Sequence, residues 1–132
     1  MTHQPKRPPL DPCPVEEVVA IIGGKWKARI ILLVSRGHAT FSALSSMLPD
    51  APDQVLATQL KALVDDGVLT KTAPVSVNGA GSQYELSDEG RSLMTLLDTI
   101  SAWGLERLRA RGKGWAPPEP KAASARPLNP QS

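Results

Sequence analysis

The residues with the clearest capacity for chemistry are one cysteine and two histidines. Cys13 directly precedes Pro14 and an amphipathic segment, so the free N–H groups of a helix start would lie beside its sulfur. A thiol there can be a switch for oxidants or electrophiles, or simply a small packed residue. His3 and His38 form no metal-ligand spacing and no nucleophile–base motif with other residues. We therefore expect no catalysis, no metal and no cofactor.

A second candidate set lies on one face of a predicted helix that runs from about residue 53 to 66. Its apolar residues recur at helical spacing and leave four residues on the outer face: Gln54, Ala57, Thr58 and Lys61. Gln pairs with adenine, Ala and the Thr methyl group contact thymine methyls, and Lys reaches guanine or phosphate. Asp53 either caps this helix or accepts a hydrogen bond from a cytosine amino group. An exposed helix face is also polar when it binds nothing, so the choice depends on the surrounding elements.

Further residues could contact a DNA backbone. Lys25, Lys27 and Arg29 cluster at the start of a predicted second helix, and Lys71 lies on a predicted strand. Ser42 lies where a third helix should begin, and it can cap that helix or contact phosphate. Each of these side chains can equally be an ordinary solvated group.

The elements that position these residues follow a recognisable order. We expect helices over 14–22, 25–36, 42–48 and 53–66, an extended link at 39–41, strands over 68–73 and 82–86, and a last helix that Ser87 caps. The fold class is mainly α with a small β-hairpin, which is a winged helix-turn-helix. This fold places the second helix of its helix-turn-helix, here the helix over 53–66, in the major groove of double-stranded DNA. That helix is called the reading helix below.

The last helix carries more apolar residues than one core-facing stripe requires. They are Leu93, Met94, Leu96, Leu97, Ile100, Trp103, Leu105 and Leu108. One side would pack inward and another on a second copy of the chain, so that helices at both ends form a dimer interface. A thick helix in a small core is the alternative.

The motifs together resemble the HxlR-type winged helix-turn-helix transcription regulators of bacteria and archaea. The matching pieces are Cys13-Pro14-Val15, Gly23-Gly24-Lys25-Trp26, Phe41-Ser42-Ala43-Leu44, Asp66-Gly67-Val68-Leu69, Tyr84-Glu85-Leu86-Ser87-Asp88-Glu89-Gly90-Arg91 and Trp103-Gly104. The resemblance implies a homodimer joined through its first and last helices, a palindromic operator, and DNA binding without metal. Several such relatives use the cysteine at the position of Cys13 as a thiol switch. Repression is the default expectation for so small a regulator.

Two departures from the family pattern affect the expected site. Relatives usually carry Ser-Pro where this chain has Pro52-Asp53, so Asp50 or the Pro52 region must cap the reading helix. Many relatives also carry an arginine near the wing tip, where this chain has Ala80-Gly81-Ser82-Gln83. We expect this tip to add little electrostatic affinity.

Two other functions remain open at this stage. The same DNA-binding dimer could be gated by an aromatic small molecule in an interface pocket walled by Trp26 and Trp103, although core packing explains both tryptophans equally well. The winged helix could also serve only protein contacts. Steep weakening of DNA binding with salt would separate the DNA-binding function from that one.

Composition bounds the rest of the chain. Proline-rich residues 1–12 and 112–132 are expected to be disordered tails around one domain over 13–111. The net charge of +2 divides into +1 and +2 in the tails and −1 in the domain, so overall charge says little about DNA binding. The sequence shows no signal peptide and no apolar run that would cross a membrane, and one unpaired cysteine suits the cytoplasm.

Overall fold

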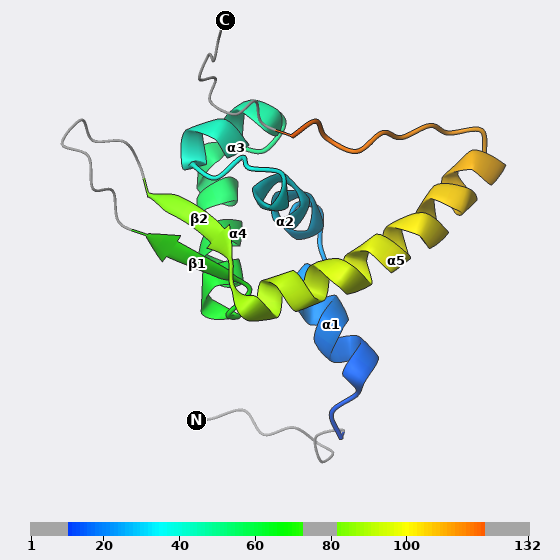
Figure 1. Cartoon of the computed structure of the whole chain (residues 1–132), viewed down its shortest axis with the longest axis horizontal. Helices are drawn as coiled ribbons and strands as arrows, with labels where there is room; N and C mark the ends of the chain where they lie inside the picture. Colours follow the sequence, from blue (N-terminus) through cyan, green and yellow to red (C-terminus); the bar gives the residue numbers. More distant parts are fainter. Residues whose placement is uncertain (1–10, 73–81, 121–132) are drawn as a thin grey trace, which may run out of the picture.

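The computed structural model describes residues 11–72 and 82–120, which form five α-helices and one antiparallel hairpin (Figure 1). The elements in chain order are α1 (Pro14–Ile22), α2 (Lys27–Ser35), α3 (Phe41–Met47), α4 (Asp53–Asp65), β1 (Leu69–Thr72), β2 (Gln83–Leu86) and α5 (Asp88–Ala110). Helices α3 and α4 with the hairpin make a winged helix-turn-helix, so the predicted fold class is confirmed.

Local sequence chemistry sets most of the helix ends. Pro14 occupies the first turn of α1, where its missing N–H costs nothing. Gly67 follows α4 with a positive φ of 81°, a conformation that glycine adopts without strain. These ends confirm the predictions.

Two helix starts differ from the predictions. Helix α2 begins at Lys27 rather than near Lys25, because Gly24 has a φ of 88° and Trp26 takes the N-cap position. Helix α3 is capped by Thr40, whose Oγ1 accepts a hydrogen bond from the Ala43 N–H at 3.1 Å. Ser42 therefore lies inside the helix, and its predicted capping role is wrong.

The core is built around α2, which packs against α1, α3, α4, α5 and β2. Ile30 and Ile31 of α2 are fully buried together with leucines of α3 and α4. Burial of such side chains supplies the main stabilising free energy of a domain this size. The reading helix α4 is thus fixed to the centre of the domain through its apolar face.

The hairpin is joined to the helix-turn-helix by a third short extended segment. Strands β1 and β2 pair with Leu69 opposite Leu86 and Lys71 opposite Tyr84. Thr40 forms an isolated bridge with Gln83, which confirms the predicted extended link before α3. The wing tip, residues 77–81, lies outside the described residues, so the expectation for its charge stays a prediction.

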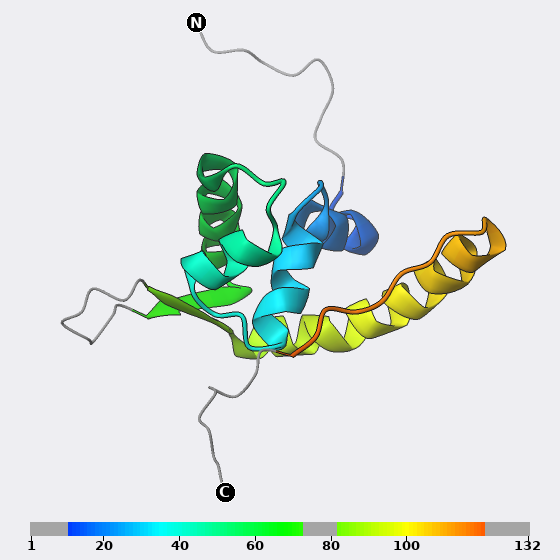
Figure 2. The same cartoon turned by 90° about the horizontal axis from the view of Figure 1, so that it is seen from above.

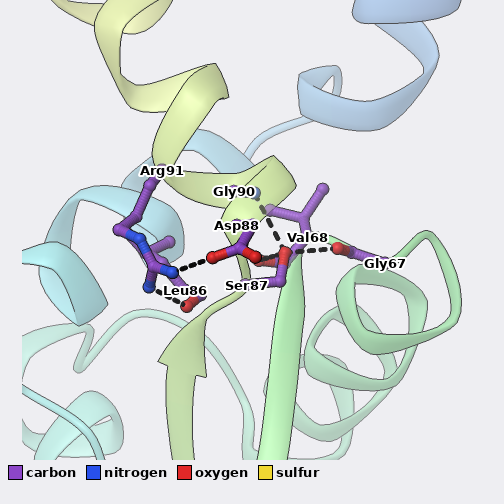
Figure 3. A network of polar contacts seen from close by, with 7 residues as sticks. All are labelled: Gly67, Val68, Leu86, Ser87, Asp88, Gly90 and Arg91. Atoms are coloured by element: carbon purple, nitrogen blue, oxygen red, sulfur yellow. Dashed lines mark hydrogen bonds and ion pairs between the residues drawn. The ribbon is translucent and has the colours of Figure 1, made fainter.

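A small polar network fixes the start of α5 (Figure 3). The Ser87 hydroxyl lies 2.5 Å from the Gly67 carbonyl oxygen and 3.0 Å from that of Val68, and its oxygen accepts from the Gly90 N–H at 2.9 Å. Arg91 donates to the Leu86 carbonyl at 2.9 Å and pairs with Asp88. A Cβ at Gly90 would lie 2.2 Å from the Val68 carbonyl oxygen, so only glycine permits this close approach. The predicted Ser87 cap is confirmed.

Helix α5 extends well beyond the rest of the domain, and the chain then turns back (Figure 2). Gly112, with a φ of 73°, ends the helix, and residues 113–120 return as an extended segment to α2 and α3. We expected residues 112–132 to be a disordered tail, and these contacts differ from that expectation for the part up to residue 120. Residues 121–132 and 1–10 lie outside the described part. No helix within 11–72 or 82–120 is long and apolar enough to span a membrane.

Candidate nucleic-acid interface

The outer face of α4 presents the four residues that the helical periodicity placed there. Gln54, Ala57, Thr58 and Lys61 are all exposed, while Leu56, Leu60 and Leu63 are buried in the core. The Thr58 hydroxyl donates to the Gln54 carbonyl oxygen at 2.9 Å. Since its hydrogen is used within the helix, the methyl group is the part of Thr58 best suited to contact a thymine methyl.

Lys61 is held beside an acid of its own helix. Its Nζ lies 3.1 Å from Asp65 Oδ2, and both side chains are mostly exposed. Exposed pairs at this spacing contribute little free energy, so Lys61 can exchange Asp65 for a phosphate or a base at small cost. Asp65 also leaves a negative charge on the face that would meet DNA.

The fold brings the hairpin next to the reading helix. A hollow of about 380 Å³ between α4 and the hairpin is lined by Ala57, Lys61, Val64, Asp65, Lys71 and Tyr84. The Lys71 ammonium lies 6.0 Å from the centre of the Tyr84 ring. Lys61 of α4 and Lys71 of β1 thus line the same hollow, together with Asp65.

The two helices of the helix-turn-helix are tied by a bond that the sequence analysis missed. The Ser45 hydroxyl donates to Asp53 Oδ1 at 3.1 Å. Pro52 takes the N-cap position of α4 with no side-chain capping bond, so neither Asp50 nor Asp53 replaces the usual serine cap. Asp53 instead links α4 to α3. One oxygen of its carboxylate already accepts a hydrogen bond from Ser45, which leaves the other oxygen for a cytosine amino group.

Ser42 is exposed in the first turn of α3, on a different hollow. That hollow, of about 320 Å³, is also lined by His38, Thr40, Ala43, Ser46 and Met47. Ser42 is accessible there to a phosphate, but it lies apart from the α4 and hairpin surface.

Lys25 and Lys27 are not brought to the outer face of α4. The Lys25 ammonium lies 5.0 Å from the centre of the Trp26 ring. Lys27 Nζ points back to the last turn of α1, 3.5 Å from the Ala20 carbonyl oxygen. Neither side chain lines the hollow between α4 and the hairpin.

The two tryptophans predicted to wall a ligand pocket have different surroundings. Trp26 packs against the core, whereas Trp103 is 68% exposed, with the Arg107 guanidinium 5.8 Å from its ring centre. A hollow of about 360 Å³ does lie between α1 and α5, and its lining residues are Pro14, Val15, Val18, Val19, Ile22, Leu96 and Ile100. Neither tryptophan lines it, so this hollow is not the pocket predicted from the sequence.

Cys13 directly precedes Pro14, which lines that apolar hollow. It is the N-cap residue of α1 and is partly buried, and its side chain makes no capping hydrogen bond. Its carbonyl oxygen accepts from the Glu17 N–H at 2.9 Å. Among residues 11–72 and 82–120, no three His, Cys, Asp or Glu side chains are grouped so as to hold a metal ion.

Comparison with known proteins decides the family. The model of the HxlR-like helix-turn-helix family matches residues 21–111, which is more than half of the chain. The chain belongs to this family. It is therefore a DNA-binding transcriptional regulator of the helix-turn-helix type and not an enzyme, as the resemblance implied.

Relatives of this HxlR-like protein carry the same general description. YtcD of Bacillus subtilis (strain 168), described as an HTH-type transcriptional regulator, is 36% identical over 94 residues, which are 71% of this chain and 74% of YtcD. YdzF of the same strain is 37% identical over 93 residues, 70% of this chain and 84% of YdzF.

Solved structures share the fold and include a redox regulator. The crystal structure of YtcD has a TM-score of 0.66 and 35% identity over 74% of this chain and 98% of that one. The reduced form of the redox regulator HypR has a TM-score of 0.66 and 28% identity over 74% of this chain and 94% of that one. HypR has also been solved in an oxidized form, with a TM-score of 0.63, 29% identity, and coverage of 70% and 94% of the two chains.

Proposed function

We propose that this protein is a repressor that binds a palindromic operator as a homodimer and reads bases with α4. The observation that carries the proposal is the exposed row on α4, with Lys71 of the hairpin beside it. Gln54 supplies the bidentate group for adenine, Ala57 and Thr58 supply methyl contacts, and Lys61 and Lys71 supply charge.

The homodimer is supported by the apolar surface that α1 and α5 leave open. Val15 is 69% exposed, Val19 55% and Ile100 43%, and all three line the hollow between the two helices. An apolar surface of this kind marks an interaction site in a regulator. Because a twofold interface uses the same surface on both copies, α1 and α5 of one protomer would pack on those of its partner. Two copies of α4 would then reach successive major grooves about 34–36 Å apart.

The reading function is tested by Gln54→Ala with Gln59→Ala as the matched control, because Gln59 lies on the same helix but is partly buried and off the outer face. Fluorescence anisotropy with the promoter of a neighbouring divergent gene should show a loss of about 30-fold or more for Gln54→Ala, since one bidentate contact contributes about 1–3 kcal/mol and the dimer makes two of them. Gln59→Ala should bind as wild type does. If the affinity for the promoter DNA changed neither with salt concentration nor with the Gln54 substitution, DNA reading by α4 would be contradicted.

We further propose that Cys13 is a thiol switch, which suits a protein working in a reducing cytoplasm. Its place at the start of α1, next to the proposed dimer surface, supports the idea, as does the likeness to a redox regulator solved in two forms. Oxidation or alkylation there would shift the two copies of α4 relative to each other and change operator affinity. Treatment with diamide or a quinone should release wild type from the operator and leave Cys13→Ser bound. If wild type and Cys13→Ser were released from the operator equally, the thiol switch would be refuted. The proposal that α4 reads DNA would not be affected.

A further inference from the structure

The segment that follows α5 lies outside the family match and returns to α2 and α3. Residues 113–120, here called the strap, start at the far end of α5 and reach α2 and α3 (Figure 1), whereas the family match stops at residue 111. Near its end, the strap is fastened to His38, whose Nε2–H donates to the Glu119 carbonyl oxygen at 3.0 Å. The His38 side chain is only 8% exposed, whereas Glu119 lies at the surface, so the bond is partly buried.

The strap and the two helices border a half-open cavity, and Trp115 of the strap is 41% exposed. The volume of the cavity is about 160 Å³, and it is lined by Arg29, Leu32 and Leu33 of α2, Met47 and Leu48 at α3, and Trp115, Ala116 and Pro118 of the strap. An apolar cavity of about 150 Å³ in another protein holds one benzene molecule. The space under the strap therefore suits a molecule with one ring and a small substituent.

The lining also indicates the charge of the occupant. Arg29 is the one charged residue of the lining, and its side chain is exposed at the edge of otherwise apolar walls. No carboxylate of residues 11–72 and 82–120 forms an ion pair with it. A guanidinium presents paired N–H donors that match the two oxygens of a carboxylate.

We propose that the strap, α2 and α3 form a binding site for a small aromatic carboxylate. The ring lies in the apolar space beneath Trp115, and the carboxylate accepts hydrogen bonds from Arg29. The site is distinct from Cys13 and from the α1 and α5 surface. It places the ligand against α3, the first helix of the helix-turn-helix, and its existence does not depend on the proposed repressor function.

The site is tested with DNA-free, full-length protein and benzoate as the probe, by isothermal titration calorimetry. Wild type should bind benzoate with a dissociation constant on the order of 0.1–1 mM, because so small a probe makes few contacts. Arg29→Met should weaken benzoate about tenfold or more, since a charge-assisted hydrogen bond is lost. Arg36→Met is the matched control, because Arg36 belongs to the end of the same helix and does not line the cavity. Benzamide, which has the same shape without the charge, should bind wild type and Arg29→Met equally.

The contribution of the strap is tested by Trp115→Ala, with Trp103→Ala as control because Trp103 lies on α5 outside the cavity. Trp115→Ala should weaken benzoate and benzamide alike, and Trp103→Ala should weaken neither. Thermal unfolding of each variant shows that it is folded. The proposal is overturned if benzoate does not bind wild type at about 10 mM, far above the range expected for such a probe. It is also overturned if Arg29→Met and Arg36→Met weaken benzoate equally, or if Trp115→Ala binds as wild type does.

Discussion

Removing two methyl groups from Val19 is the most direct test of the proposed twofold interface. Val19 is 55% exposed in the single chain and lines the apolar hollow between α1 and α5. Complete burial of the two groups that Val19→Ala removes contributes about 1.6 kcal/mol. Scaled by the exposed fraction of 55%, the loss is about 0.9 kcal/mol per protomer. A twofold interface contains two copies of Val19, so the dimer should lose about 1.8 kcal/mol, which is roughly a 20-fold rise in its dissociation constant.

Sedimentation equilibrium over a range of concentrations measures this constant directly. The helix propensity of alanine is also more favourable than that of valine by about 0.6 kcal/mol. This gain stabilises the folded monomer and the dimer equally, so it does not change the dissociation constant. Met47→Ala is the matched control, because Met47 is another exposed apolar residue and lies on α3, away from α1 and α5. Equal dissociation constants for Val19→Ala and wild type, or a wild type that stays monomeric at about 100 μM, would refute the assignment of α1 and α5 as the interface.

Two further substitutions test the anchoring of α5 and the charge of the reading face. Ser87→Ala removes the cap of α5 and should lower the free energy of unfolding in urea by about 1–2 kcal/mol, whereas Ser92→Ala, on the exposed side of the same helix, should change it little. Similar midpoints for the two variants would show that the Ser87 hydroxyl in Figure 3 contributes nothing to stability. Asp65→Asn releases Lys61 and removes one negative charge, so it should tighten operator binding about two- to fivefold at low salt, with less effect at high salt. Asp66→Asn removes the same charge without touching Lys61, and an equal gain from both would refute the specific role of the ion pair.

Features that act within one helical turn were predictable from the sequence. Pro14, Gly67 and Ser87 end or begin helices through their own backbone limits and side-chain bonds, so their effect needs no knowledge of distant residues. The outer face of α4 followed from periodicity in the same way. The ion pair of Lys61 with Asp65 could also have been predicted from the sequence, since the two residues are four positions apart on one helix.

Features that depend on tertiary placement were not predictable. Composition made residues 112–132 look like a tail, but one tryptophan in that stretch finds apolar side chains of α2 and α3 that are distant in sequence. Trp103 has the opposite outcome, because the second half of α5 runs past the core that would have covered it. The bond from Ser45 to Asp53 likewise depends on the angle between two helices, which no spacing in the sequence states.

The shape of α5 has a mechanical consequence. Its last residue deeply buried in the domain is Leu97, and the helix continues to Ala110. From Gly90 to the far end the helix is about 30 Å long, so a tilt of about 5° at its base would displace that end by ~2.6 Å. Gly90 touches the Val68 carbonyl closely and leaves little room for such a tilt. The packing at Gly90 therefore fixes the direction of α5, and through its length it also fixes the position of the far end of the helix.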